Sequence, residues 1–228
     1  MSDYAFEPPA PVGLPIAGSD ALFPVRRVYC IGRNYAAHAI EMGGDPDREA
    51  PFFFQKNPNN LDTTGQFPYP AKSEDVHHEA ELAVMLKSGG TNIPLDEAES
   101  HIFGYAVSLD MTRRDLQAEQ KATRRPWEIG KAFERSAPVG PVHRVEQTGI
   151  LNEGPMVLKV NGAVRQEGDL NQMVWKVPEM ISYLSEYFEL AAGDVILSGT
   201  PAGVGPVEKG DVMEMSVAGL GSITVTVV

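Results

Sequence analysis

The chain has 228 residues, of which 43% are hydrophobic and 22% are charged, a composition that can bury a sizeable core and excludes intrinsic disorder. Its formal net charge of -12 disfavours a nucleic-acid partner, because an acidic chain repels polyphosphate. The N-terminus lacks a signal-peptide layout and no apolar run is long enough to span a bilayer, so we expect a cytoplasmic protein without a membrane partner. The single cysteine, Cys30, excludes an internal disulfide and a thiolate-rich zinc site.

The N-terminal residues favour an extended arm rather than a helix. Residues 1–24 are rich in proline and glycine, which interrupt regular helices. We therefore expect an arm over residues 1–24 that lies along the surface, followed by one domain over residues 25–228. The first predicted element of that domain is a strand at residues 27–31, which ends at Gly32.

The rest of the chain predicts many strands and few helices. Residues 34–42 predict a short helix, whereas residues 50–70 have no helical period and predict a loop at the rim of a site. Asn161 and Gly162 predict the turn of a β-hairpin, because both tolerate positive φ, and Pro178 opens a predicted amphipathic helix. Runs of apolar and β-branched residues predict strands at residues 78–86, 103–109, 156–160, 163–165, 194–197, 211–217 and 222–228. These elements predict an α+β domain that is dominated by β-strands.

Three carboxylates are candidate metal ligands. Glu79 and Glu81 are separated by one residue in a predicted strand, so their side chains point to the same face and can converge on one hard cation. Asp110 follows the next predicted strand and offers a third carboxylate. The pattern predicts a site for Mg²⁺, Mn²⁺ or Ca²⁺, although a solvent-exposed face with two glutamates has the same spacing.

His38 and Glu41 are candidates for activating a water molecule. They are three residues apart on the predicted helix 34–42, so the carboxylate can orient the imidazole and raise its basicity. An exposed pair on a helix surface has the same spacing. Cys30 is a competing nucleophile that His38 could activate, but a cysteine inside an apolar strand is usually inert packing.

Four further polar residues are candidates for binding an anionic ligand. If residues 110–117 are helical, Arg114 and Gln117 share one face with Asp110, which would then cap that helix or bind the metal. Lys131 is flanked by apolar residues, so its ammonium could stabilise an oxyanion in a partly dry site. Thr200 lies in a glycine-rich turn after a predicted strand; the turn lacks the lysine of a phosphate-binding loop, and its backbone N–H groups could hold a carboxylate.

Five segments together resemble the fumarylacetoacetate hydrolase family, in the order in which that family carries them. They are residues 32–38 (Gly-Arg-Asn-Tyr-Ala-Ala-His), 79–81 (Glu-Ala-Glu), 110–117 (Asp-Met-Thr-Arg-Arg-Asp-Leu-Gln), the segment around Lys131, and 197–205 (Leu-Ser-Gly-Thr-Pro-Ala-Gly-Val-Gly). Residues 51–56 and 125–127 are most similar to the members that cleave fumarylpyruvate in bacterial gentisate catabolism. Residues 57–60 (Asn-Pro-Asn-Asn) depart from the usual pattern of those members at the substrate-facing loop.

The resemblance implies a mixed β-sheet roll that forms a homodimer, with residues 25–228 as the catalytic domain. It implies that Mg²⁺ or Mn²⁺, or Ca²⁺ in a crystal, is bound by Glu79, Glu81 and Asp110, and that His38 and Glu41 activate water. The implied substrate is a small 2-oxo acid, and the expected reaction hydrolyses a carbon–carbon bond of an acylpyruvate, such as 3-fumarylpyruvate, to fumarate and pyruvate. Oxyanion or substrate contacts are implied for Arg33, Lys56, Arg114, Gln117, Lys131 and Thr200.

Two other functions compete with this hydrolysis. An oxaloacetate decarboxylase or a tautomerase of 2-oxo acids would use the same metal chelate without attack by water. A non-catalytic protein that binds a metal or a dicarboxylate would keep the fold. The presence of His38, Glu41 and Lys131 disfavours the second, because a pure binding protein does not need a pair that activates water.

Overall fold

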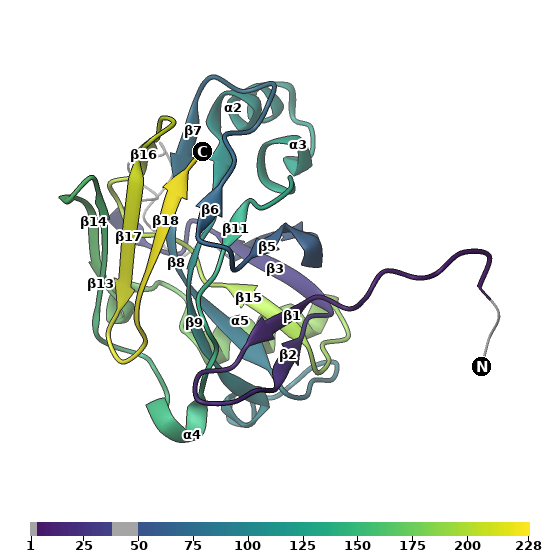
Figure 1. The fold of residues 1–228 in the computed structure, drawn as a ribbon. Coiled ribbons are helices and arrows are strands. Elements are labelled where there is room, and N and C mark those ends of the chain that lie inside the picture. The colour runs from purple at the N-terminus through teal and green to yellow at the C-terminus, as the bar shows by residue number, and fades with distance from the viewer. Residues whose placement is uncertain (1–3, 38–49) are drawn as a thin grey trace.

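The computed structural model describes residues 4–37 and 50–228, and strands dominate this part of the chain (Figure 1). The described helices are few and short, as the sequence predicts. They are α2 (Arg114–Thr123), α3 (Glu128–Lys131), α4 (Val145–Thr148) and α5 (Val177–Tyr187), with single turns of 3-10 helix at η1 (Pro58–Asn60), η2 (Ala98–His101) and η3 (Leu170–Gln172). The expected β-dominated α+β class is confirmed.

Two larger sheets and three small ones contain the described strands. The first large sheet has the order β12 (His143–Arg144), β9 (Ile102–Leu109), β8 (Ala80–Leu86), β15 (Asp194–Leu197), β3 (Arg27–Gly32), β4 (Phe52–Lys56). The second has the order β14 (Ala163–Asp169), β13 (Pro155–Val160), β17 (Val212–Val217), β18 (Gly221–Val227), β6 (Gln66–Phe67). The small sheets are β10 (Thr112–Arg113), β7 (Val76–His78), β16 (Gly205–Pro206); β11 (Ala137–Pro138), β5 (Leu61–Asp62); and β1 (Gly13–Pro15), β2 (Leu22–Pro24).

The six-stranded sheet is buried on both faces. Every residue of β8 is buried, and successive side chains alternate between two apolar clusters. Leu82 and Val84 belong to the larger cluster, whereas Ala83 and Met85 belong to the smaller one. This alternation is the period of a strand between two packed layers. The run of apolar residues around Glu81 is therefore explained by its place in the middle of the core.

The five-stranded sheet contains the hairpin that the sequence predicts. Its turn residues Asn161 and Gly162 have φ values of 52° and 78°, and the flanking strands β13 and β14 pair antiparallel. On β18 buried and more exposed positions alternate, since Val225 and Val227 are buried while Thr224 is exposed. One face of this sheet therefore contributes to the core and the other faces outward.

The N-terminal arm is partly packed and partly exposed. Strands β1 and β2 form an antiparallel hairpin whose Leu14 and Phe23 side chains are buried in the smaller apolar cluster. The residues before this hairpin extend away from the body (Figure 1), and Tyr4 and Phe6 are 70% and 78% exposed. The expected surface arm is therefore shorter than residues 1–24, because its second half is anchored by apolar side chains.

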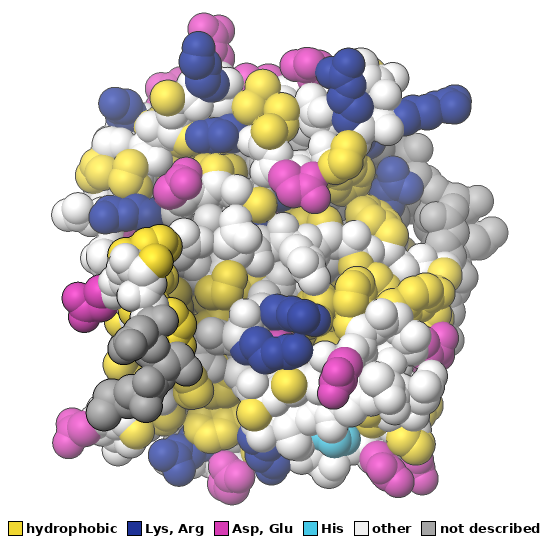
Figure 2. Space-filling model, turned by 90° about the vertical axis from the view of Figure 1, so that its right-hand side faces the viewer, with side chains coloured by type: hydrophobic (Ala, Val, Ile, Leu, Met, Phe, Trp, Pro, Cys, Tyr) yellow, Lys and Arg dark blue, Asp and Glu magenta, His cyan; other side chains and the backbone are white. Residues whose placement is uncertain are grey.

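The surface shown in Figure 2 mixes basic, acidic and apolar side chains, without one continuous basic area on this face. That the protein has no nucleic-acid partner stays a prediction. Among the described residues, no helix combines the length and the apolar character that a membrane crossing requires.

Candidate metal centre and its cavity

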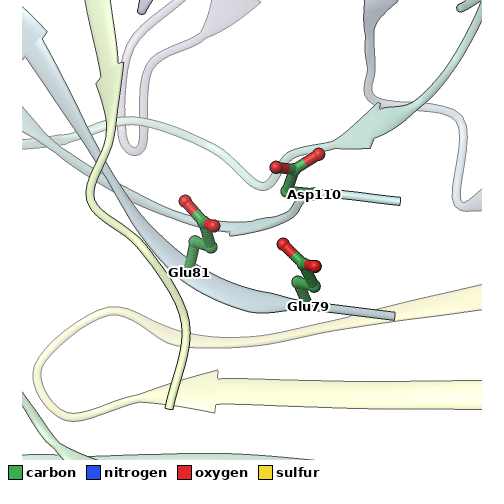
Figure 3. A group of neighbouring side chains, drawn as sticks. All are labelled: Glu79, Glu81 and Asp110. Carbon is green, nitrogen blue, oxygen red and sulfur yellow. The ribbon is translucent and has the colours of Figure 1, made fainter. Parts of the chain in front are cut away.

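Three buried carboxylates converge at one point of the fold. Glu79 lies between β7 and β8, Glu81 lies within β8, and Asp110 directly follows β9, the neighbour of β8 in the sheet. Figure 3 shows their carboxylates facing a common space. One oxygen of each lies within 4.8 Å of the others. Two oxygens that bind one ion at about 2.0 to 2.6 Å are at most about 5 Å apart, so this spacing fits a divalent cation.

The strand pairing explains this convergence. Ala80 pairs with Leu109 and Glu81 with Ser108, which places the start of β8 beside the end of β9. The Asp110 N–H donates to the Glu79 carbonyl at 2.8 Å. The sequence predicts one continuous strand over residues 78–86, whereas the structure interrupts it at Glu79. The two glutamates nevertheless reach the same side, as their spacing predicts.

Three cationic side chains surround these carboxylates. Lys131 Nζ lies 2.7 Å from Glu79 Oε2 and 2.7 Å from Asp110 Oδ2. Arg114 donates to Glu79 Oε1 at 2.6 Å. Lys56 Nζ lies 2.8 Å from Asp110 Oδ1 as an ion pair, although this oxygen accepts no hydrogen bond of good geometry. Asp110 thus keeps an oxygen with unused acceptor capacity inside the core, which suits a ligand of a hard cation.

The electrostatic environment shifts the pKa values of two of these groups. Burial, together with the nearby carboxylates of Asp110 and Glu79, raises the pKa of Glu81 well above its usual range, although Lys131 and the Gly199 N–H oppose this shift. Burial alone lowers the pKa of Lys131, but Asp110 and Glu79 outweigh it and the net shift is upward. Lys131 is therefore a charged ammonium, and a bound cation would stabilise the ionised form of Glu81.

Helix α2 places two more of the predicted residues beside the centre. Arg114 is its first residue, and Arg114 also donates to Gln117 Oε1 at 2.7 Å. Residues 110–117 do not form one helix, because Thr112 and Arg113 form β10 against β7. Asp110 is therefore neither in the helix nor its cap, and it joins the site through the end of β9.

The turn after β15 contacts the centre at Glu81. The Gly199 N–H donates to Glu81 Oε2 at 2.9 Å, and Gly199 has a φ of 93° that favours glycine. Thr200 Oγ1 accepts from Gln166 Nε2 at 2.8 Å. Asn34 holds this turn in place, because its amide donates to the Ser198 carbonyl at 2.8 Å. The glycine-rich turn therefore supports a glutamate through its backbone rather than binding phosphate.

Gln166 is a buried residue that sequence reasoning missed. It lies on β14, its Oε1 accepts from the Ala80 N–H at 3.0 Å and lies 2.9 Å from His78 Nδ1, and its amide also donates to the Pro201 carbonyl. It thus joins the segment of the two glutamates to the Thr200 turn. Nothing local in the polar, exposed strand 163–169 distinguishes this position, so only the tertiary structure identifies it.

One cavity contains most of the predicted site residues. The space between its walls amounts to about 430 Å³, which includes solvent at the open mouth. Its lining consists of cations, carboxylates, aromatic rings and a few neutral residues: Ile31, Gly32, Arg33, Phe52, Phe54, Glu79, Glu81, Arg114, Gln117, Lys121, Trp127, Lys131 and Thr200. The sequence did not single out Phe52, Phe54, Trp127 or Lys121 as site residues.

Two predicted site residues in the described part of the chain, Lys56 and Asp110, are not among the residues that line this cavity. Lys56 lies behind Asp110 with a fully buried side chain, where it contacts the Lys131 carbonyl and lies 2.8 Å from Ser136 Oγ. Its expected contact with substrate is therefore replaced by a contact with a candidate metal ligand. His38 and Glu41 lie outside the described residues. Burial raises the pKa of the Cys30 thiol well above its usual range, which agrees with inert packing.

The fold and this cavity define a strand-dominated domain with a buried carboxylate group suited to a divalent cation. The family profile described as Fumarylacetoacetate (FAA) hydrolase C-terminal matches residues 27–228. The chain belongs to the fumarylacetoacetate hydrolase family.

Relatives of the chain catalyse more than one reaction. The crystal structure of fumarylpyruvate hydrolase from Pseudomonas aeruginosa in complex with Mn²⁺ and pyruvate is similar, with a TM-score of 0.97 and 51% identity over 99% of both chains. The mitochondrial oxaloacetate decarboxylase of Dictyostelium discoideum is 39% identical over 86% of this chain and 90% of its own. An oxaloacetate tautomerase of Escherichia coli (strain K12) is 38% identical over the same shares. The family is thus established, and these relatives differ in reaction.

Proposed function

We propose that this protein is a divalent-metal-dependent hydrolase that cleaves a carbon–carbon bond of an acylpyruvate, with 3-fumarylpyruvate as substrate and fumarate and pyruvate as products. The observation that carries the proposal is the group of Glu79, Glu81 and Asp110, since both glutamates line the same cavity as Lys131 and Gln117. The similarity to a fumarylpyruvate hydrolase over 99% of both chains supports this reaction. Such an enzyme would act in the catabolism of aromatic compounds.

The three carboxylates are the proposed ligands of Mg²⁺ or Mn²⁺. Their oxygens are close enough to share one ion, they are buried, and Asp110 Oδ1 has unused acceptor capacity. The bound ion would supply a Lewis acid that binds the carboxylate and 2-oxo group of the substrate and favours negative charge on the departing pyruvate unit. The Mn²⁺ complex of the Pseudomonas aeruginosa hydrolase supports this choice of metal.

The cationic and amide groups of the cavity would bind the substrate and stabilise developing charge. Lys131 is charged and buried beside the carboxylates, so its ammonium is placed to stabilise an oxyanion in a site of low dielectric. Arg114 holds the Gln117 carbonyl oxygen, which leaves the Gln117 amide as a donor for a substrate oxygen. Arg33 and Thr200 lie on the same wall and would contact substrate oxygens.

His38 and Glu41 are the proposed base and its orienting carboxylate. In the hydrolysis His38 takes one proton from water, and the hydroxide oxygen bonds to the acyl carbonyl carbon that becomes the carboxylate of fumarate. The bond between that carbon and the methylene carbon of the pyruvate unit breaks, and the methylene carbon receives a proton to give pyruvate. Water supplies both the oxygen and the proton, so the reaction balances without an oxidant or a reductant.

A second candidate function is the decarboxylation or tautomerisation of oxaloacetate. The relatives with 39% and 38% identity that act on oxaloacetate favour it. Both reactions need the activation of a 2-oxo acid by the carboxylate-bound ion and do not need an attack by water on a carbonyl carbon. The same Glu79, Glu81 and Asp110 would therefore support them, whereas His38 would serve proton transfer or no chemical purpose.

A comparison of substrates tests the proposal. Purified protein with Mn²⁺ is assayed with 3-fumarylpyruvate, with acylpyruvates of graded length and with oxaloacetate, and the release of pyruvate and the loss of the enol absorbance are recorded. The proposal expects the largest kcat/KM for 3-fumarylpyruvate. A larger value for oxaloacetate would favour the second candidate instead, and turnover that survives complete removal of divalent ions would contradict a metal-dependent reaction.

The assembly and the location of the protein are further proposals. We propose a homodimer in the cytoplasm, as the resemblance of the sequence implies, without a nucleic-acid or membrane partner. Sedimentation equilibrium of the purified full chain tests the dimer, and a monomer at micromolar concentration would contradict it.

A further inference from the structure

We propose that Lys121 and Arg33 form a second anion subsite at the open end of the cavity, which binds the distal carboxylate of the substrate. The inference rests on the proposed function and deepens it, because it restricts the substrates to 2-oxo acids that carry a second carboxylate. Its evidence is the placement of these two cations, their lack of an anionic partner among the described residues, and the aromatic side chains of the cavity wall.

The placement of Lys121 follows from the geometry of α2. Arg114, Gln117 and Lys121 follow one another at intervals of three and four residues in this helix, so they lie on one face. All three line the cavity. Arg114 contacts Glu79 at the buried end, whereas Lys121 is only half-buried. The face of α2 therefore runs along the cavity from the carboxylates towards solvent, with Lys121 at the outer end.

Arg33 reaches the same open end from β3. It directly follows the last residue of this strand, it is half-buried, and it lines the cavity together with Lys121. Its backbone has a φ of 58°, in the left-handed region that residues other than glycine rarely adopt. The preceding residue must be small, because a Cβ on Gly32 would lie 1.9 Å from the Phe52 ring. The backbone is thus held in an unusual conformation that places a guanidinium at the cavity.

These two cations differ from the other cations near the carboxylates, because they have no anionic partner in the described part of the chain. Lys131, Lys56 and Arg114 each pair with Glu79 or Asp110. Among residues 4–37 and 50–228, Lys121 and Arg33 form no ion pair, and the recorded side-chain contact of Arg33 is with the Phe52 ring, 5.8 Å from its centroid. Burial and the charges of Arg33 and Arg114 lower the pKa of Lys121. Neighbouring cations without a carboxylate, on a chain of net charge -12, are arranged for an anionic ligand.

The wall of the cavity is suited to the spacer between two carboxylates. Phe52, Phe54 and Trp127 line it, with Phe52 and Trp127 in an edge-to-face contact at 5.3 Å and Phe54 and Trp127 at 6.0 Å. Flat apolar surfaces of this kind contact an unsaturated, planar chain favourably. A ligand with a 2-oxo acid at one end, a planar spacer and a carboxylate at the other end complements the cavity along its length.

Binding of paired 2-oxo acids tests the subsite without depending on turnover. 2-Oxoglutarate and 2-oxoadipate are each compared with the monocarboxylate of equal chain length, in the presence of Mn²⁺, by isothermal titration calorimetry. Within each pair the chelating end is identical and only the distal carboxylate differs. At the best chain length we expect the dicarboxylate to bind about 10- to 100-fold more tightly, as one or two charge-assisted hydrogen bonds provide.

Four variants separate the subsite from a general effect of charge. Lys121→Met and Arg33→Met should remove most of the preference for the dicarboxylate and change monocarboxylate affinity less than about 2-fold. Lys121→Arg should retain the preference, because it keeps the charge. Lys209→Met is the matched control, since Lys209 is exposed and outside the cavity lining. Equal weakening of both ligand classes by Lys121→Met, or an unchanged preference, would overturn the subsite.

The failure of the subsite and the failure of the proposed function are distinguishable. If the wild-type protein cleaves no acylpyruvate but still prefers dicarboxylates through Lys121, the subsite stands and the reaction must be replaced. If acylpyruvates are cleaved equally well with and without a distal carboxylate, the reaction stands and the subsite is wrong. If no 2-oxo acid binds in the presence of Mn²⁺, both are wrong.

Discussion

Lys131 Nζ lies 2.7 Å from Asp110 Oδ2, and both side chains are buried. Lys131 pairs with two candidate metal ligands, Glu79 and Asp110. Its positive charge therefore offsets part of the negative charge that these carboxylates offer to a bound cation. The Lys131→Met substitution should lower activity by about 10²- to 10³-fold, as the loss of one oxyanion donor does. It should not weaken Mn²⁺ binding, since it removes a competing positive charge.

The measurement is kcat for acylpyruvate cleavage together with calorimetric titration of Mn²⁺. Removing one partner of a buried ion pair typically costs about 3 to 5 kcal/mol, so the free energy of unfolding without divalent ions should fall and should recover when Mn²⁺ is added. If the Lys131→Met protein kept its activity, the proposed role of Lys131 as an oxyanion donor would be wrong.

Each of the three carboxylates should be individually required for metal binding. Glu81→Gln and Asp110→Asn each remove a charged ligand, so Mn²⁺ affinity should fall by at least about 100-fold, the upper range for disturbed metal sites. Titration calorimetry gives the affinity, and circular dichroism shows whether the fold is kept. Glu167→Gln is the matched control, because Glu167 is exposed on β14. Unchanged Mn²⁺ affinity of Glu81→Gln would place the metal elsewhere.

Metal binding should depend on pH through Glu81. In the folded protein the pKa of Glu81 is raised above its usual value of 4.5. Between the pKa of the unfolded chain and the raised pKa of the folded state, the folded protein without metal therefore binds more protons than the unfolded chain. The contribution of Glu81 to stability is present at low pH and is lost as the pH rises through this window. A bound metal ion requires the ionised carboxylate, so Mn²⁺ affinity should instead rise over the same window.

Titrations of Mn²⁺ in buffers with different ionisation enthalpies measure the protons that are released. The release should decrease as the pH rises through the raised pKa of Glu81, and it should vanish in the Glu81→Gln variant. Binding enthalpies that are identical in all buffers would show that Glu81 is already ionised before the metal binds.

His38 should separate hydrolysis from the reactions of oxaloacetate. General-base catalysis is typically worth about 10² to 10⁴ in rate, so His38→Ala should lose acylpyruvate cleavage by this factor. Mn²⁺ binding and any decarboxylation of oxaloacetate should persist, since they depend on the chelate. Glu41→Gln should lose less, because it keeps a hydrogen-bonding partner for the imidazole. If His38→Ala hydrolysed acylpyruvate at nearly the wild-type rate, another residue would have to be the base. If the variant lost both acylpyruvate cleavage and oxaloacetate decarboxylation, this segment would belong to the metal site instead.

Gln166 should matter for stability and for the Thr200 turn. Its side chain is 1% exposed and contacts Ala80, His78, Thr200 and Pro201. Gln166→Met would leave several buried polar groups unpaired, and each costs about 1 to 3 kcal/mol. Chemical denaturation should therefore show a clear loss, with a higher KM for substrate. The neighbouring Arg165→Met, at an exposed position, is the control and should leave stability almost unchanged.

Local sequence patterns predicted many of the strands and the convergence of the candidate metal ligands for identifiable reasons. Asn161 and Gly162 specify a tight turn because their backbones tolerate positive φ, and the structure has both residues in that conformation. Glu79 and Glu81 converge because side chains two residues apart in extended backbone point to one side. Both inferences depend on neighbours in the chain and not on tertiary contacts.

Other parts of the site depend on contacts between distant segments. Residues 110–117 have a helical spacing of polar side chains, but Thr112 and Arg113 pair with β7 instead, so the helix begins only at Arg114. Lys56 follows an aromatic run that suggests a substrate loop, yet antiparallel pairing of β4 with β3 directs it into the core behind Asp110. No local pattern contains the partner strand, and therefore none predicts these outcomes.

The order of strands in the six-stranded sheet has a consequence for the biosynthesis of the protein. β3, which is made early, pairs in parallel with β15, and β15 is the strand that separates β3 from β8. The sheet therefore cannot form while the ribosome is still translating the first half of the chain. Loop closure between such distant strands slows folding. The nascent chain should leave β3 and β8 exposed until Leu197 has emerged, so chaperones are expected to bind it during that interval.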